Sequence, residues 1–213
     1  PFKYLLNTHH HGDHTAGNIV FKGLVQNVVA HQNSLVNQKL AAEKANSLDK
    51  QLLPDTTFGK GWKAPVGKEK ISAYYYGSGH TNGDAIYHFE NANIVHVGDL
   101  VFNRRFPYID KENGAHIGNW ITALGKIYNQ FDKDTIVITG HSLDPEKVVG
   151  DKENVKAFKN YLECLLTFVK AEMKAGKSKE EILKATTIPG APEWKGDGIA
   201  RSLTAAYTEL TVG

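Results

Sequence analysis

The sequence predicts a layered α/β domain. Short apolar runs that end in turn-forming residues alternate with longer segments whose apolar residues recur at helical spacing, which is typical of strands and helices stacked in layers. The chain has 213 residues, enough to bury a core without disulfides, and its single cysteine, Cys164, has no partner within the chain. Because no repeat or low-complexity tract interrupts the pattern, a single domain over residues 1–213 is expected.

Composition and charge indicate which classes of binding partner to expect. Hydrophobic residues make up 41% and charged residues 23% of the chain, ordinary values for a globular protein. The 25 Lys and Arg residues are scattered among 23 Asp and Glu residues, which does not indicate a nucleic-acid surface. No apolar run approaches the ~18 residues of a membrane span. We therefore expect a small-molecule substrate, with neither nucleic acid nor membrane as partner.

Strands are predicted wherever a short apolar run meets turn residues, at 4–6, 27–30, 71–76, 85–89, 94–97 and 135–139. Apolar residues near helical spacing predict helices at 31–49, 120–131 and 152–175. The first of these helices is predicted to be amphipathic from Leu35, Val36, Leu40 and Ala41. A Ser178–Glu181 capping box predicts a further helix start, and the Pro- and Gly-rich residues 54–70 predict a loop.

A dense histidine cluster follows the first predicted strand. Residues 8–14 read Thr-His-His-His-Gly-Asp-His and contain the pattern H-x-H-x-D-H. In an extended segment His9 and His11 point to the same side, while Asp13 and His14 fall on the next turn and can reach a neighbouring point. Imidazole and carboxylate ligands suit Zn²⁺ and leave it Lewis-acidic, so one short loop could serve two metal ions.

Three more candidate ligands lie at predicted strand ends. His80, Asp99 and His141 each follow a glycine directly after, or at the end of, a predicted strand. Each alone is a weak signal, because a single histidine is usually a hydrogen-bonded structural residue. Their shared placement indicates one common site.

The order of these motifs resembles the metallo-β-lactamase superfamily of metallohydrolases. The resemblance rests on H-x-H-x-D-H, then Gly79-His80-Thr81, Gly98-Asp99 and Gly140-His141, and spans most of the chain. It implies a four-layer αββα sandwich. It also implies that His9, His11 and His80 hold a first metal, that Asp13, His14 and His141 hold a second, and that Asp99 bridges the two.

The start of the chain departs from the superfamily pattern, in which half of a β-sheet precedes the first motif. Almost nothing precedes it here, so we expect a chain truncated at its N-terminus. The alternatives are self-association or a separate chain that carries the N-terminal half. Without such a cover, Tyr4, Leu6 and Val28 are expected to face solvent.

The resemblance implies a hydrolase with two zinc ions, with iron or manganese as alternative metals. Asp99 stands where dedicated zinc β-lactamases carry cysteine or serine, which favours an enzyme that cleaves an ester, lactone, thioester or amide bond through a metal-bridging hydroxide. Asp13 is the expected catalytic residue, orienting that hydroxide and passing its proton to the leaving group. An iron-dependent oxidoreductase and a phosphodiesterase or nuclease of the same scaffold are the alternatives. Resemblance to often exported bacterial members favours a periplasmic or secreted location over a cytoplasmic one.

The loop after Asp99 is expected to overhang the metals and bind substrate. Arg104 and Arg105 suit a carboxylate or phosphate, and Phe106 and Tyr108 suit the wall of an apolar pocket. Residues near the ligands that could orient them are Thr8, Thr81, Asn82 and Asp84. The remaining histidines match no ligand position and are expected to be structural.

Overall fold

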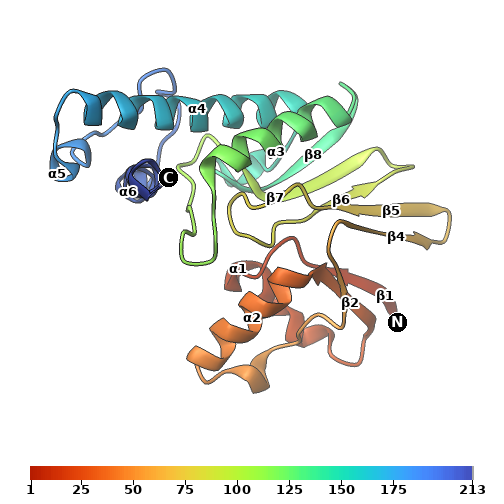
Figure 1. Cartoon of the computed structure of the whole chain (residues 1–213). Helices are drawn as coiled ribbons and strands as arrows, with labels where there is room; N and C mark the ends of the chain where they lie inside the picture. Colours follow the sequence, from red (N-terminus) through yellow and green to blue (C-terminus); the bar gives the residue numbers. More distant parts are fainter. Residues whose placement is uncertain (213) are drawn as a thin grey trace.

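Two β-sheets lie face to face with helices on both outer sides, as a computed structural model of the chain shows for residues 1–212 (Figure 1). The smaller sheet is parallel and has the order β1 (Phe2–Leu6), β2 (Val25–His31), β3 (Thr56–Phe58). The larger sheet is mixed and follows chain order: β4 (Gly61–Val66), β5 (Glu69–Tyr74), β6 (Ile86–Phe89), β7 (Ile94–Asn103), β8 (Ile136–Ser142) and β9 (Val149–Gly150). The predicted α/β class is confirmed.

Helices cover the outer face of each sheet. On the outer side of the smaller sheet lies α2 (Gln32–Lys44), while the short helix α1 (Gly12–Thr15) lies beside the sandwich edge that carries the predicted ligands (Figure 1). The larger sheet is covered by α3 (Ile117–Gln130) and α4 (Lys152–Lys174), and α5 (Lys179–Ile182) and α6 (Ile199–Val212) follow at one end. Short 3₁₀ turns occupy Ala16–Phe21, Leu48–Lys50 and Pro145–Lys147. None of the helices in residues 1–212 has the length and apolar character to cross a membrane.

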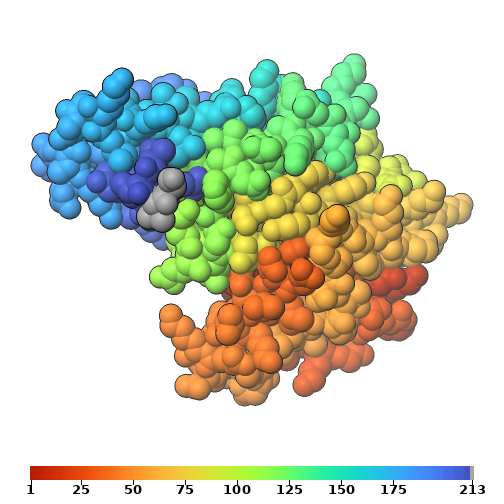
Figure 2. Space-filling view, viewed as in Figure 1, coloured from red at the N-terminus to blue at the C-terminus, as the bar shows by residue number. Residues whose placement is uncertain are grey.

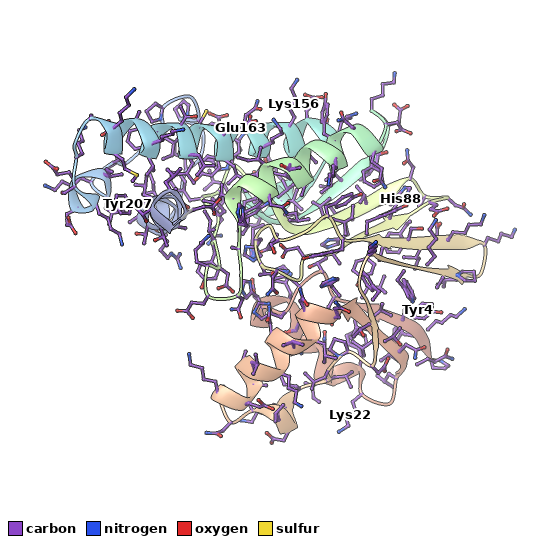
Figure 3. The ribbon with its side chains drawn as sticks, in the orientation of Figure 1. Tyr4, Lys22, His88, Lys156, Glu163 and Tyr207 are labelled. Carbon is purple, nitrogen blue, oxygen red and sulfur yellow. The ribbon has the colours of Figure 1, made fainter. Side chains whose placement is uncertain are left out.

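The main core lies between the larger sheet and its helices. Trp120 of α3 and Phe158 of α4 are completely buried there, with ring centroids 5.3 Å apart. A second, smaller core lies between the sheets, where Tyr4 of β1, labelled in Figure 3, packs edge to face against Trp62 of β4. Together the two cores fix the relative position of the strand ends that carry the histidines.

The expected loop over residues 54–70 is wrong, because β3 and β4 lie within it. Proline and glycine normally argue against a strand, but β4 is the edge strand of its sheet. An edge strand tolerates Pro65, whose nitrogen has no hydrogen to donate. It is the edge position, which the sequence does not reveal, that makes this composition compatible with a strand.

The predicted apolar face of α2 is also wrong. Val36 and Leu40 are 54% and 57% exposed, whereas the polar residues Ser34, Asn37 and Gln38 are buried. The buried face is held by hydrogen bonds, since the Asn37 side chain donates to Asn82 and the Gln38 side chain donates to Gln51. Pairing of polar groups removes most of the cost of burying them.

The expectation that Val28 faces solvent is wrong too, since it is only 1% exposed. Tyr4 and Leu6 are half-buried against the small core between the sheets. β1 pairs with β2 alone within residues 1–212, so one edge of this strand carries no partner there.

Candidate metal centre

The end of β1 delivers the first histidine cluster. The chain leaves β1 at Leu6, and His11 forms the N-cap of the short helix α1, which carries Asp13 and His14. His80 comes from the loop between β5 and β6, Asp99 from β7 and His141 from β8. All seven predicted ligands meet at one edge of the sandwich.

Three histidines of the first group point their ring nitrogens at one spot. His11 Nδ1 lies 3.0 Å from His9 Nε2 and 2.9 Å from His80 Nε2. Asp99 Oδ2 closes the group at 3.3 Å from His80 Nε2 and 3.7 Å from His9 Nε2. Tetrahedral Zn²⁺ with bonds of about 2.0–2.1 Å needs donors roughly 3.3 Å apart, so these separations fit a metal ion.

The second group lies beside the first and shares Asp99. Asp13 Oδ2 is 3.1 Å from His141 Nε2 and 3.4 Å from His14 Nε2. Asp99 directs Oδ1 toward His14 Nε2 at 3.1 Å and Oδ2 toward His141 Nε2 at 3.4 Å. Its two oxygens therefore face both groups, the arrangement that a bridging carboxylate requires.

The glycines before Asp99 and His141 lie where a side chain would not fit. A Cβ on Gly140 would lie 2.0 Å from Asp99 Oδ1, so no other residue fits beside the carboxylate. Gly98 has a φ of 53°, and a Cβ there would meet the Thr8 side chain at 2.6 Å. The glycines that precede Asp99 and His141 in the sequence motifs are thus explained by close approach.

The remaining ring nitrogens of the first group are held by oxygen atoms. His80 Nδ1 lies 2.7 Å from the Tyr108 carbonyl oxygen, His11 Nε2 lies 2.9 Å from Asp110 Oδ2, and His9 Nδ1 lies 3.1 Å from Thr8 Oγ1. A carbonyl or carboxylate acceptor fixes the proton on the outer nitrogen and leaves the inner nitrogen free to bind a metal. Asp99 Oδ1, moreover, is buried without a hydrogen bond of acceptable geometry, which also fits a cation.

Electrostatics favours neutral imidazoles beside an ionised aspartate. Burial alone would raise the pKa of Asp99, but the surrounding histidines, His80 foremost, hold it well below its usual range. Burial lowers the pKa of His80 to about 4 and that of His9 well below its usual value. Neutral imidazole and ionised carboxylate are the forms that bind metal ions. By contrast, the hydrogen bond with Asp99 raises the pKa of His141.

A small cavity of about 130 Å³ lies next to the candidate metal centre and is lined by Asp13, Asp99, His11 and His141. Its wall also includes residues from the end of β7, from the loop after it and from the C-terminal region: Phe102, Arg105, Phe106, Tyr108, Asp197 and Arg201. Two larger pockets, of about 440 and 650 Å³, lie elsewhere on the surface, and none of the predicted ligands lines them.

The structure places Arg104 away from this cavity. The residue has a φ of 60°, and its guanidinium lies 4.6 Å from the centre of the Trp194 ring. Of the two predicted arginines only Arg105 lines the cavity, together with the predicted Phe106 and Tyr108. The expectation that Arg104 faces the metals is therefore wrong, because the left-handed backbone conformation directs its side chain toward Trp194.

Three residues of this region were not predicted from the sequence. Asp197 and Arg201 line the cavity from beyond the last motif, and Asp110 supports His11 from behind. Asp110 lies in the loop that was expected to overhang the metals, but no local spacing marks it. His10 lies next to it, with Nε2 3.9 Å from Asp110 Oδ2. Burial lowers the pKa of His10 to about 4, in keeping with a structural histidine.

Comparison with known proteins identifies the family. The model of the metallo-beta-lactamase superfamily matches residues 1–141, about two thirds of the chain and every predicted ligand. The chain belongs to this superfamily. Its His and Asp groups and this membership make it a metal-dependent hydrolase of the metallo-β-lactamase fold. No curated protein matches the sequence.

Solved structures of other superfamily members share the fold. The metallo-beta-lactamase from Pontibacter korlensis is 22% identical with a TM-score of 0.61, and the match covers 76% of this chain and 70% of that one. The DIM-1 metallo-beta-lactamase is 23% identical with a TM-score of 0.58, covering 74% and 67%. The metallo beta lactamase from Hirschia baltica is 20% identical with a TM-score of 0.56, covering 76% and 68%. At these identities the likeness concerns the fold.

Proposed function

We propose that this superfamily member is a two-zinc hydrolase of an ester, lactone, thioester or amide bond. The observation that carries the proposal is the convergence of the two ligand groups on Asp99, whose oxygens lie 3.1–3.4 Å from His14, His80 and His141. Zinc ions held by these groups would supply Lewis acidity and a water activated near neutral pH.

The position of each residue determines its proposed role. In this proposal His9, His11 and His80 hold the first ion, Asp13, His14 and His141 hold the second, and Asp99 holds both. Asp13 is the most exposed of the ligands, with 57% of its side chain accessible at the cavity. It can therefore accept a proton from the attacking water and deliver it to the leaving group.

The cavity wall suits a small acyl group. Phe106 and Tyr108 supply aromatic surface beside Asp99 and His141. The volume of about 130 Å³ is below the roughly 300–1,000 Å³ of pockets that enclose drug-sized ligands. The enclosed part of the site thus takes the reacting group while the rest of the substrate lies outside.

The test combines metal analysis with a substrate panel. Protein purified without added metal is analysed for bound elements, stripped with chelator and reloaded with zinc. It is then assayed with 4-nitrophenyl acetate, an acyl lactone, a thioester, nitrocefin and bis(4-nitrophenyl) phosphate. We expect two zinc ions per chain and zinc-dependent cleavage of at least one acyl substrate. Cleavage of the phosphodiester alone, or a single metal ion per chain at saturation, would contradict the proposal.

A further inference from the structure

The buried polar face of α2 lies against the loop that carries His80. Gly83 of this loop packs directly on the helix, since a Cβ there would lie 2.7 Å from a backbone nitrogen of α2. Two side chains of the helix donate to the preceding residue: Asn33 Nδ2 lies 2.8 Å from the Asn82 carbonyl oxygen, and Asn37 Nδ2 lies 2.9 Å from Asn82 Oδ1. The helix therefore holds the chain two residues after His80.

Asn82 also joins this loop to the loop after β7. Its backbone amide donates to the Asn113 carbonyl at 2.9 Å, and its own carbonyl accepts from the Tyr75 hydroxyl at 2.9 Å. Gly114 has a φ of 79°, and a Cβ there would lie 3.0 Å from Asn82 Cβ. Figure 2 shows the three segments side by side, with α2 in orange, the loop before β6 in yellow and the loop after β7 in green. Asn82 is the residue at which they meet.

Asn113 extends this contact to the metal centre. Its side-chain Nδ2 donates to Asp110 Oδ2 at 2.7 Å, and its backbone amide donates to Asp110 Oδ1 at 3.1 Å. The same Oδ2 accepts from His11 Nε2 at 2.9 Å. A continuous series of hydrogen bonds thus runs from α2, through Asn82 and Asn113, to the carboxylate that holds a ligand of the first group.

The loop after β7 supports a second ligand of that group. The Tyr108 carbonyl oxygen lies 2.7 Å from His80 Nδ1, and the Asp110 amide donates to the His80 carbonyl at 3.2 Å. The His116 amide donates to the Gly79 carbonyl at 3.0 Å. Because one loop supports both His80 and His11, a displacement of this loop moves both rings.

Packing alone does not explain amides on the inner face of α2. Apolar side chains would be easier to bury there, because a buried amide needs a partner for its hydrogen-bonding groups. Asn37 is only 6% exposed, and its amide nitrogen has that partner in Asn82. Hydrogen bonds in a buried network fix direction as well as distance, whereas hydrophobic contacts are not directional. The polar face therefore suits an element that must hold a neighbouring loop in one place.

We propose that Asn37 and Asn113 are positioning residues for the first metal group and that α2 is part of its support. The inference rests on the proposed function, because it takes the first ligand group to hold zinc. Asn37 holds Asn82, the backbone of Asn82 fixes the place of Asn113, and Asn113 directs the Asp110 carboxylate toward His11. Neither positioning residue contacts a metal ligand, and both act through Asp110.

The test measures zinc affinity by competition with a chromogenic chelator. Asn113→Ala removes a donor to an ionised carboxylate, so the affinity of the first site should fall about tenfold. Asn37→Leu removes a neutral hydrogen bond further from the metal, and the loss should be about threefold. In an Asp110→Ala background neither substitution should weaken binding further, since both act through that carboxylate. Losses that simply add to the loss caused by Asp110→Ala overturn the inference.

The matched control is Gln38→Leu, which removes another buried amide from the same face of α2. Gln38 is 3% exposed, and its side chain donates to Gln51 at 3.1 Å rather than to Asn82. Both helix variants should have a lower free energy of unfolding, but only Asn37→Leu should bind zinc more weakly. Equal zinc affinities in the two variants would mean that α2 supports only the fold. If Asn37→Leu does not fold, Asn33→Ala takes its place, because it removes the other α2 donor to Asn82.

A second readout uses the metal-free protein. The ¹⁵N chemical shifts of the imidazole ring report which nitrogen carries the proton, and in the unmodified protein and in Gln38→Leu we expect His11 to carry it on Nε2. Asn113→Ala should give a mixture of the two tautomers, because the acceptor is no longer held in place. A single Nε2-protonated form in Asn113→Ala overturns the inference and leaves the hydrolase proposal standing. Absence of zinc binding by the unmodified protein counts against the proposed function, and the tautomer measurement then still tests the positioning of His11.

Discussion

Replacement of Asp110 should weaken metal binding without touching a predicted ligand. The Asp110 side chain is 2% exposed, and its Oδ2 accepts from His11 Nε2 at 2.9 Å and from Asn113 Nδ2 at 2.7 Å. Burial would raise the pKa of Asp110, but the hydrogen bonds from His11 and Asn113 lower it to about 2. The ionised carboxylate therefore holds the His11 ring and increases the basicity of Nδ1.

The size of the effect follows from what each variant keeps. In Asp110→Asn the amide oxygen can still accept from His11, but the charge is lost and the amide nitrogen faces the Asn113 backbone donor, which lies 3.1 Å from Oδ1. We expect zinc affinity at the first site to fall about tenfold. In Asp110→Ala no acceptor remains, and the loss should approach about 100-fold, the upper end for such supporting residues.

Competition with a chromogenic zinc chelator measures both affinities, and thermal melting of the metal-free protein checks that each variant is folded. The matched control is Asp49→Asn, which changes an exposed aspartate of the same charge. A well-folded Asp110→Ala variant with unaltered zinc affinity would show that His11 needs no support from behind.

Three further predictions concern neighbours of the centre. Burial raises the pKa of Asp84 to about 7, above the ~3.9 of an unfolded chain, so the metal-free protein should lose up to about 4 kcal/mol of stability between pH 4 and 7 through this group. Asp84→Asn should remove that loss in urea unfolding at pH 4.5 and 7.5, and identical pH slopes would contradict it. Gly140→Ala should displace Asp99 and abolish binding of the second zinc ion by elemental analysis, whereas Gly125→Ala, where the added Cβ meets nothing closer than 3.8 Å, should retain it. Asp99→Ala should cost more hydrolytic activity and more bound zinc than Arg104→Ala, because only Asp99 contacts both ligand groups; equal losses with unchanged zinc content would mean that Asp99 does not bridge.

The convergence of the candidate ligands was predictable because the motifs that carry them are local. His9, His11, Asp13 and His14 lie within one short segment. The glycines that precede Asp99 and His141 also have a physical reason, since Gly98 lies close to the Thr8 side chain and Gly140 lies close to the Asp99 carboxylate. The extent of the strands was less predictable. β7 runs from Ile94 to Asn103, past the expected end at 97, with irregular pairing to β8 on both sides of Gly98. Such a bulge aims Asp99 into the site and has no reliable sequence signature.

Features that depend on distant partners were missed. The buried face of α2 can be polar because Asn82 and Gln51, which lie outside the helix, accept hydrogen bonds from the side-chain amide nitrogens of Asn37 and Gln38. Asp110 gains its role only when folding brings it against His11. No helix was predicted over residues 199–212, so Arg201 was not considered for the site. In each case the informative contact is between segments that a periodicity analysis treats separately.

We expect metal binding and substrate binding to depend on different parts of the chain. The superfamily match ends at His141, the last predicted ligand, whereas Asp197 and Arg201 reach the cavity from beyond it. On this expectation, changes in the C-terminal helices would alter what is bound without altering metal binding. Deleting α6 would not test this division, because Leu203 and Ala206 are completely buried and their loss would expose the main core. A test must instead replace side chains that project from α6 without holding the helix in place. Arg201 is such a side chain, because it is exposed and because Ser202 and Glu209 anchor the helix.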